Sequence, residues 1–402
     1  MLSAHEALAA ILDRIEPLPP QVCPLGDALG RVLAEPVVAR EPLPPFTNSA
    51  MDGFALRAVD TPGRLRLLAA QPAGVDTGQV VVPGTAVRVM TGAPLPVGAD
   101  TVVPLEDAVL DLESVHIEGA VRVGAHIRVL GEDVAAGEVV LTPGTRLRPA
   151  EVGLLGAVGA PRVWVFPAPR VAVLTTGDEL VDVAEPLGPA RIRDANIHAL
   201  CAQVRACGAV PVPIARVPDT AKDLEAAIRQ ALVTADVICT NGGVSMGDLD
   251  HVRPVLERLG AEPVFWQVAQ KPGRPMAFSR LDGKPVFGIP GNPVAAQLCF
   301  ERYVRPALLQ MMGLRWLHRP RLRVQLAEPI RKAASDTRTH LLRVLLEETA
   351  QGVVARLTGP QGSGLLTSMT RSQALLVLAP EAHDLPAGAW VEVCLTDLPE
   401  DH

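Results

Sequence analysis

Strand-length apolar runs alternate with amphipathic helical segments over residues 170–313, and this alternation constrains the fold more than any other feature of the chain. The predicted helices cover residues 196–207 and 220–233. The predicted strands cover residues 171–174, 210–214, 237–239, 264–266, 276–278 and 286–289. Such alternation is typical of right-handed βαβ units, so we expect a mainly parallel sheet. Because its turns carry neither a dinucleotide glycine fingerprint nor a Walker A lysine, this sheet should bind another kind of ligand.

Polar side chains collect in the loops that follow these strands. The carboxyl ends of parallel strands meet at one edge of a sheet, where ligands bind, and paired glycines let backbone amides approach an anion. The loops are TTGDEL with Glu179, the turn with Asp219, NGGVSMGD with Gly242, Gly243 and Ser245, KPGRP with Lys271 and Arg274, and GIPGNPV with Pro290 and Pro293. Taken singly, the glycine pair can be a tight turn and Asp219 can be a helix N-cap. Five such loops on one sheet indicate a phosphate or metal site.

Composition places the chain among globular proteins and excludes several classes of partner. With 402 residues, 48% of them hydrophobic, the chain can bury large cores. A net charge of -7 argues against a general nucleic-acid or anionic-membrane binder, which needs a clustered basic excess. The 6 cysteines lack the close pairing of a zinc site or a disulfide framework, so we expect reduced core residues. Neither a signal peptide nor a membrane-spanning run is found, which predicts a soluble, cytoplasmic protein.

The pattern changes along the chain and predicts several domains. Residues 1–45 and 138–168 should form a helical and extended linker domain, with short helices near residues 25–33 and 149–159 and a capping box from Ser3 to Glu6. Residues 46–137 have short apolar runs separated by glycine and proline, which predicts an inserted β-rich module. Residues 169–318 contain the α/β sheet, and residues 319–402 have the short runs of a small β-barrel. The predicted fold class is therefore multidomain, α/β plus β.

Eight motifs in a fixed order carry a resemblance to a known family. They are PPFTNSAMDGFAL, MTGAPLPVGAD, GEDVAAGE, TTGDEL, IRDANIHAL, NGGVSMGD, KPGRP and GIPGNPV. In this order the chain resembles the MoeA family of molybdopterin molybdenumtransferases and is similar to the E domain of gephyrin. The resemblance covers nearly the whole chain. It implies that the α/β domain is of the molybdopterin-binding type.

The resemblance also implies a reaction. The family joins molybdate to the dithiolene of adenylylated molybdopterin, releases AMP and leaves the molybdenum cofactor, with Mg²⁺ or another divalent cation assisting. We expect a molybdate oxygen to attack the adenylate phosphorus before molybdenum passes to the dithiolene sulfurs, without a protein nucleophile. The implied partners are therefore adenylylated molybdopterin and molybdate, with possible contacts to the pterin adenylyltransferase and to cofactor-receiving enzymes.

Functional positions follow from the same motifs. The resemblance assigns metal or adenylate-side carboxylates to Glu179, Asp219 and Asp250, with Asp248 as an alternative, and pterin or phosphate contacts to Gly242, Gly243 and Ser245. It assigns the oxyanion end to Lys271, Arg274, Pro290 and Pro293, and molybdate contacts to Arg343 and Ser363. Asp52, Thr91 and Asp133 match positions that face the active site of the other subunit, which implies a homodimer.

The chain departs from the family pattern at three positions. Thr47 stands where family members often have aspartate, Asn241 where they have serine, and Gln267 where they have lysine. The last change removes a cation near the oxyanion region, so the preference between molybdate and tungstate is open. A paralogue that inserts tungstate and a non-catalytic pterin-binding scaffold are the alternatives. Pterin adenylyltransferases and competence-damage-type proteins share a related α/β domain, but they lack the amino-terminal modules and the carboxyl-terminal barrel pattern.

Overall fold

A computed structural model describes residues 1–243, 251–350 and 352–396 of the chain. The chain forms two compact units. One comprises Met1–Gln21, Gly30–Ala34 and Val165–His402, and the other comprises Val22–Leu29 and Glu35–Trp164. This division is coarser than the four segments expected from the sequence, whose boundaries stay a prediction.

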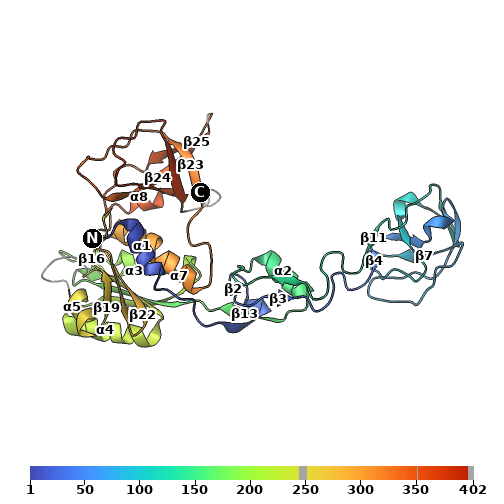
Figure 1. Ribbon diagram of the computed structural model, residues 1–402, viewed down its shortest axis with the longest axis horizontal. Coiled ribbons are helices and arrows are strands. Elements are labelled where there is room, and N and C mark those ends of the chain that lie inside the picture. Colours follow the sequence, from blue (N-terminus) through green and yellow to red (C-terminus); the bar gives the residue numbers. More distant parts are fainter. Residues whose placement is uncertain (244–250, 351, 397–402) are drawn as a thin grey trace. The chain divides into compact units, whose positions relative to one another are not determined.

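A six-stranded sheet forms the centre of the first unit (Figure 1). Its strand order is β17-β14-β18-β22-β21-β19. The strands are β14 (Arg170–Thr176), β17 (Val210–Val217), β18 (Val237–Asn241), β19 (Glu262–Phe265), β21 (Ala277–Leu281) and β22 (Lys284–Ile289). β14 pairs in parallel with β17 and β18, and β18 pairs in parallel with β22, whereas β21 is antiparallel to both of its neighbours. The predicted mainly parallel sheet is confirmed.

Alternate side chains of β14 enter two separate apolar cores. Val171 and Val173 pack with residues of α1, α3, α6 and α7, whereas Ala172 and Leu174 pack with residues of α4 and α5. Because successive strand residues point to opposite faces of a sheet, helices cover both faces of this one. The helices are α1 (Ala4–Leu12), α3 (Ala195–Ala206), α4 (Ala221–Thr234), α5 (Val252–Arg258), α6 (Pro293–Cys299) and α7 (Arg305–Met311).

Side-chain caps fix where three of these helices begin. At α1 the Glu6 amide donates to Ser3 Oγ and the Ser3 amide donates to the Glu6 carboxylate at 2.8 Å, which confirms the predicted capping box. At α3 the Ile197 amide donates to the Asp194 carboxylate. At α4 the cap is Thr220. The last two caps hold the loops before α3 and α4 at the carboxyl edge of the sheet.

β17 lies at one edge of the central sheet and pairs with β14. It carries Pro211 and Pro213. Proline has no amide hydrogen to donate to a ladder, so within sheets it is confined mainly to edge strands. The two prolines therefore fit the position of β17.

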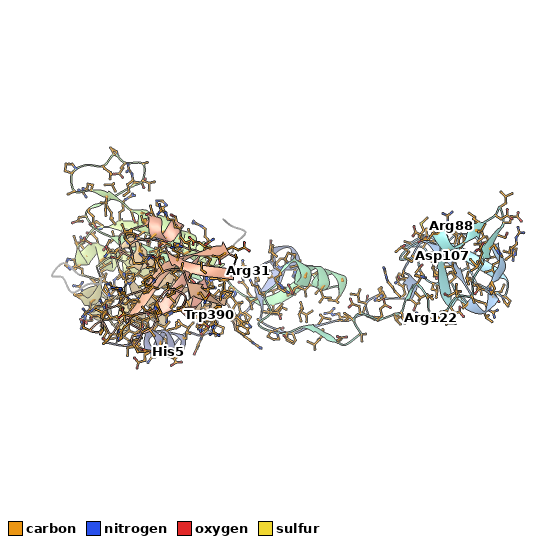
Figure 2. The ribbon with its side chains drawn as sticks, turned by 90° about the horizontal axis from the view of Figure 1, so that it is seen from above. His5, Arg31, Arg88, Asp107, Arg122 and Trp390 are labelled. Carbon is orange, nitrogen blue, oxygen red and sulfur yellow. The ribbon has the colours of Figure 1, made fainter. Side chains whose placement is uncertain are left out.

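The last part of the chain forms a closed five-stranded barrel in the same unit (Figure 1). Its strands are β23 (Arg321–Leu326), β24 (Thr339–Thr349), β25 (Gly352–Leu357), β26 (Ala374–Leu378) and β27 (Trp390–Leu395). β24 pairs with both β25 and β26, which closes the barrel. Trp390, labelled in Figure 2, lies on this barrel with Arg323 Cζ 5.3 Å from its ring centroid. The predicted barrel is confirmed.

A short strand connects the KPGRP loop to the barrel. β20 (Gln270–Lys271) pairs in parallel with β24, so that Gln270 lies beside Thr339 and Lys271 beside His340. The loop is thus anchored on the barrel as well as on the α/β sheet that precedes it in the chain.

The second unit contains the β-rich module, whose sheet has the order β8-β5-β7-β6-β10-β9. These strands are β5 (Gly53–Leu56), β6 (Gly63–Leu67), β7 (Thr85–Val89), β8 (Thr101–Pro104), β9 (Val109–Leu110) and β10 (Ser114–Ile117). Phe54 and Leu56 enter one apolar cluster and Ala55 enters another, as expected for a strand. Figure 2 shows the side chains of this module, with Arg88 labelled on β7.

One of the two short helices expected in the amino-terminal segments is present. α2 (Pro149–Ala157) confirms the helix expected near residues 149–159. The helix expected near residues 25–33 is wrong, because the chain forms only a 3₁₀ turn at Leu25–Asp27 and then β2 (Val32–Leu33). Gly30, with φ at +78°, lies in the left-handed region and stops a helix there. Within the described ranges, no helix is both long and apolar enough to cross a bilayer.

Candidate functional site

A cavity of about 570 Å³ opens at the carboxyl ends of β14 and β18. It brings together five of the residues expected from the sequence, which are Glu179, Asp219, Gly242, Gly243 and Pro293. It also contains Asp194, Asn196, Asn241, Arg193 and Leu366. Four of the five polar loops predicted from the sequence therefore contribute residues to this cavity, whereas the KPGRP loop contributes none.

The two glycines at the end of β18 lie where larger residues do not fit. A Cβ on Gly242 would lie 2.9 Å from Thr176 O, and one on Gly243 would lie 2.9 Å from Val252 Cγ2. Both have positive φ, at +94° and +62°. The Gly242 amide donates to Ile289 O at 3.1 Å, so this amide completes the sheet. Gly242 therefore serves the cavity by letting the end of β18 approach Thr176 closely.

Two carboxylates face this cavity from different loops. Asp219 precedes α4, and because Thr220 is the N-cap, the alternative in which Asp219 caps the helix is wrong. The Asp219 amide donates to Asp178 Oδ1 at 3.2 Å, which ties its loop to TTGDEL. A Cβ on Gly177 would lie 2.6 Å from Glu179 Oε2, so the glycine leaves room for that carboxylate.

The donor set suits a divalent cation. Carboxylate oxygens are the hard ligands that Mg²⁺ prefers, and Glu179 and Asp219 supply them to one cavity. Among the residues that the structure describes, no group of three or more histidine, cysteine, aspartate or glutamate side chains is arranged around a common metal position. Ser245, Asp248 and Asp250, the other residues expected in this loop, lie outside the described residues.

A network of side-chain amides links three of the strand-end loops. Asn196 Nδ2 donates to Asn241 Oδ1 at 2.8 Å and to Gly291 O at 2.7 Å. Asn241 Nδ2 donates to Pro290 O at 2.7 Å, and Asn241 is only 3% exposed. Pro290 thus takes part through its carbonyl. Sequence reasoning missed Asn196, although its place two residues after the capping Asp194 was a usable signal.

Two further side chains of the lining were also missed. Asp194 accepts a hydrogen bond from Thr175 Oγ1 at 2.5 Å besides capping α3, so its role is to position the loop. Arg193 brings a cation to the cavity, and its Nε donates to Val183 O at 2.9 Å. The motif IRDANIHAL contains both, but nothing in their spacing separates a cavity residue from a helix start.

Lys271 and Arg274 lie on the KPGRP turn and are not among the residues that line the cavity. Lys271 is exposed and lies beside His340. His340 Nε2 lies 2.9 Å from Asp336 Oδ2, and Arg338 donates to the same carboxylate. The Arg338 hydrogen bonds lower the pKa of Asp336, whereas burial lowers the pKa of His340. Lys271 therefore lies beside an imidazole whose pKa is lowered, and the Arg338–Asp336 ion pair is next to that imidazole.

Arg343 is fully buried inside the barrel wall. Its Nε donates to Ser368 Oγ at 3.1 Å and its Nη2 to Gly362 O at 3.2 Å, while Nη1 is buried without a hydrogen-bond partner. Burial lowers the pKa of this guanidinium. The neighbouring residue Ser363 accepts a hydrogen bond through its carbonyl from the Val294 amide at the start of α6. The structure therefore places Ser363 beside the start of α6, whose Pro293 lines the cavity, and it buries Arg343 within the barrel.

The remaining expected residues belong to the second unit. The Asp52 carboxylate accepts hydrogen bonds from the Thr91 amide at 2.6 Å and from Thr91 Oγ1 at 2.8 Å. Both hydrogen bonds lower the pKa of Asp52, and the one from the Thr91 amide has the larger effect. The Asp133 amide donates to Leu43 O at 3.0 Å. Asp52 and Thr91 thus form one polar pair, as expected for turns that present a carboxylate.

Comparisons with known proteins agree along the whole chain. Family models match as the MoeA N-terminal region (domain I and II) over residues 2–159, the probable molybdopterin binding domain over residues 172–310 and the MoeA C-terminal region (domain IV) over residues 323–396. Molybdopterin molybdenumtransferase 2 of Mycobacterium tuberculosis is 36% identical over 405 residues, covering 98% of this chain and 99% of the relative. Molybdopterin molybdenumtransferase of Haemophilus influenzae is 33% identical over 400 residues, covering 98% of each chain.

Solved structures give the same result for the fold. The crystal structure of the molybdopterin biosynthesis moeA protein from Pyrococcus horikoshii OT3 has a TM-score of 0.83 at 30% identity, over 98% of this chain and 100% of that one. The resemblance seen in the eight motifs is confirmed by these matches, which cover the amino-terminal, α/β and barrel parts alike. The chain belongs to the MoeA family.

Proposed function

We propose that the protein inserts molybdate into adenylylated molybdopterin, forming the molybdenum cofactor and releasing AMP. The observation that carries this proposal is the single cavity shared by Glu179, Asp219 and the Gly242–Gly243 pair, in a chain that covers its molybdenumtransferase relatives from end to end. A scaffold that only binds pterin has no need of two carboxylates on separate loops of one cavity. The catalytic reading is therefore favoured over the scaffold.

The chain's own residues would bind and orient two anions. Gly242 and Gly243 line the part of the cavity that would take the pterin or its phosphate, and Asn241 keeps the Pro290 carbonyl and its loop in place. Lys271 and Arg274 would hold the oxyanion, and fixed cations stabilise charge that develops during transfer of the adenylate phosphorus. We assign Arg343 and Ser363 to the molybdate side, with Ser363 fixed beside the start of α6.

Magnesium is the cation that we propose for the cavity. Glu179 and Asp219 would hold it together with Asp250. When bound, it would neutralise phosphate charge and polarise the bond that breaks at the adenylate phosphorus. The Asp219 amide donates a hydrogen bond to Asp178 of the TTGDEL loop, which would keep the Glu179 and Asp219 carboxylates in fixed relative positions.

We further propose a cytoplasmic homodimer in which Asp52, Thr91 and Asp133 of one chain complete the site of the other. The family resemblance and the Asp52–Thr91 hydrogen bonds support this proposal. Molybdate is the proposed oxyanion, with tungstate as the alternative, and exchange of substrate and product with the adenylyltransferase and with cofactor-receiving enzymes would follow.

The decisive experiment measures AMP release from adenylylated molybdopterin with molybdate, tungstate or neither, and with magnesium present or chelated. We expect release that depends on molybdate and magnesium and that falls about 100-fold in Asp219→Asn. Asp223→Asn, on the first turn of α4, is the matched control and should keep its activity. Pterin binding without AMP release under all conditions would establish the scaffold instead, and release driven by tungstate alone would establish the paralogue.

Mixing two inactive variants tests the composite site. If Asp52 acts across the dimer, Asp52→Ala and Asp219→Asn chains that exchange subunits should recover roughly one quarter of wild-type activity, because half of the dimers then hold one intact site. Absence of recovery, with exchange of subunits verified by mass, would show that Asp52 serves its own chain or none.

A further inference from the structure

A fully buried polar network lies directly beneath the KPGRP turn. Gln270, Cys299 and Tyr303 are each 0% exposed. Tyr303 Oη donates to Gln270 Oε1 at 2.5 Å. Gln270 Nε2 donates to Gly273 O at 3.2 Å and to Cys299 Sγ at 3.4 Å. The Gln270 side-chain amide therefore accepts a hydrogen bond from Tyr303 through its oxygen and donates one to the KPGRP turn through its nitrogen.

The network is costly to disturb. A buried donor or acceptor that loses its partner pays its full desolvation penalty, so removal of either side chain leaves the other unsatisfied. Burial raises the pKa of Tyr303, so its hydroxyl keeps its proton at neutral pH and is a donor there. The Tyr303 hydroxyl thereby sets which face of the Gln270 amide points to the turn.

The KPGRP turn packs closely against this network at Gly273. Gly273 has φ of +94°, and a Cβ there would lie 2.5 Å from Cys299 Sγ and 2.6 Å from Gln270 Nε2. The Val268 amide donates to Arg274 O at 3.0 Å, which closes the turn from the other side. A shift of the Gln270 amide must therefore move the Gly273 carbonyl and the residues next to it.

The helix that supplies Tyr303 also reaches the cavity. α6 begins at Pro293, which lines the cavity, and continues into the π-helical segment Phe300–Val304 that carries Tyr303. π-Helical segments inside α-helices are frequent at functional sites, because the extra residue re-aims the side chains that follow. Here the segment aims a tyrosine at the amide that supports Lys271 and Arg274.

We propose that Gln270 and Tyr303 are positioning residues of the transferase. They fix the Gly273 carbonyl and thereby hold Lys271 and Arg274 in the geometry that receives the oxyanion. This inference rests on the proposed function of the turn, but the network itself can be tested without turnover. A displacement of about 1 Å in groups that orient a substrate is enough to cost on the order of 100-fold in rate.

The test uses Tyr303→Phe, Gln270→Met and the double variant in the full-length protein. Gln310→Leu is the matched control, because Gln310 Nε2 also donates to backbone carbonyls, at Leu12 and Ile15, far along the chain from the turn. Amide hydrogen exchange is followed in peptides that cover residues 267–276. AMP release is measured against molybdate concentration for each variant.

We expect the amides of residues 267–276 to exchange faster in Tyr303→Phe and in Gln270→Met than in the wild type. In Gln310→Leu their exchange rate should be unchanged. We also expect KM for molybdate to rise about tenfold in both variants with a smaller change in kcat, because the turn binds the oxyanion. In the Gln270→Met background, Tyr303→Phe should add little, since the tyrosine acts through the amide.

The two levels of the proposal fail in different ways. Unchanged exchange in both variants overturns the positioning role whatever the activity, and so does faster exchange with an unchanged KM for molybdate. A wild-type protein without AMP release overturns the proposed function, while the exchange result still decides whether the network holds the turn. If Gln270→Met does not fold, the more conservative Tyr303→Phe carries the same comparison.

Discussion

Gln267 Oε1 accepts hydrogen bonds from both Nε and Nη2 of Arg274, at 3.3 and 3.2 Å. Gln267, where the family resemblance leads us to expect a lysine, thus holds Arg274 of the KPGRP turn by its neutral carbonyl oxygen. A lysine at this position would repel Arg274 and free it, but it would also add a positive charge. A glutamine at position 267 therefore gives the turn one positive charge fewer than a lysine would, but it fixes the side chain of Arg274.

Gln267→Lys should strengthen oxyanion binding, since a further cation near a dianion adds about 1 kcal/mol at the surface of a protein. We expect KM for molybdate to fall about fivefold at low salt, and the gain should shrink as ionic strength rises. Molybdate titrations of AMP release at two salt concentrations measure this. Gln267→Met, which removes the hydrogen bonds without adding charge, is the control and should raise KM. A salt-independent response of the lysine variant would contradict the electrostatic explanation.

Gly177→Ala should disturb the proposed magnesium site. Its Cβ would lie 2.6 Å from the Glu179 carboxylate, and its φ of +151° lies in the region that disfavours alanine. We expect the magnesium concentration for half-maximal AMP release to rise about tenfold or more. Gly188→Ala, where the nearest atom is 3.9 Å away, is the matched control. An unchanged magnesium titration would show that Glu179 is not a metal ligand.

Asn196→Ala should lower stability as well as activity, because it leaves the Asn241 amide oxygen and the Gly291 carbonyl without their donor. We expect the free energy of unfolding in urea to fall by about 1 to 3 kcal/mol. Gln230→Ala, an exposed amide on α4, is expected to change it by less than about 0.5 kcal/mol. Equal effects of the two variants would mean that the amide network contributes nothing.

Asp336→Asn should change how stability depends on pH. The Arg338 hydrogen bonds lower the pKa of Asp336 in the folded protein, so its contribution is fully present above the ordinary carboxyl pKa and is lost progressively as pH falls from there through the lowered folded-state pKa. We expect the variant to be less stable by about 1 to 2 kcal/mol at pH 7, and the difference from the wild type to be smaller at about pH 2. Urea unfolding at both pH values measures the difference. A constant difference would contradict the assignment.

Secondary structure and fold class followed from the sequence wherever the hydrophobic period was clear. The helices α3 and α4 lie where apolar spacing predicted them, and the barrel lies within residues 319–402, as their short apolar runs predicted. The helix expected near residues 25–33 failed because Gly30 needs a left-handed conformation that composition alone does not reveal. The antiparallel direction of β21 was also beyond prediction, since an apolar run has no sense of direction.

The site was predictable as a set of loops but not as a set of contacts. Glu179 and Asp219 could be named because they lie in strand-end loops, where ligands bind, and because the family resemblance assigns carboxylates to these positions. Gln270 and Tyr303 could not, because a glutamine inside an apolar segment and a tyrosine on a helix are ordinary core residues until their partners are known. Contacts between residues 33 positions apart depend on packing, which local pattern does not encode.

The two prolines of β17 protect the otherwise open flank of the central sheet. A strand eight residues long with unpaired amides would be a template on which a second copy could stack and seed aggregates. Pro211 and Pro213 offer no amide hydrogens, so a continuous ladder cannot form along that flank. Pro211 and Pro213 on the edge strand thus oppose edge-to-edge association of the protein at high concentration.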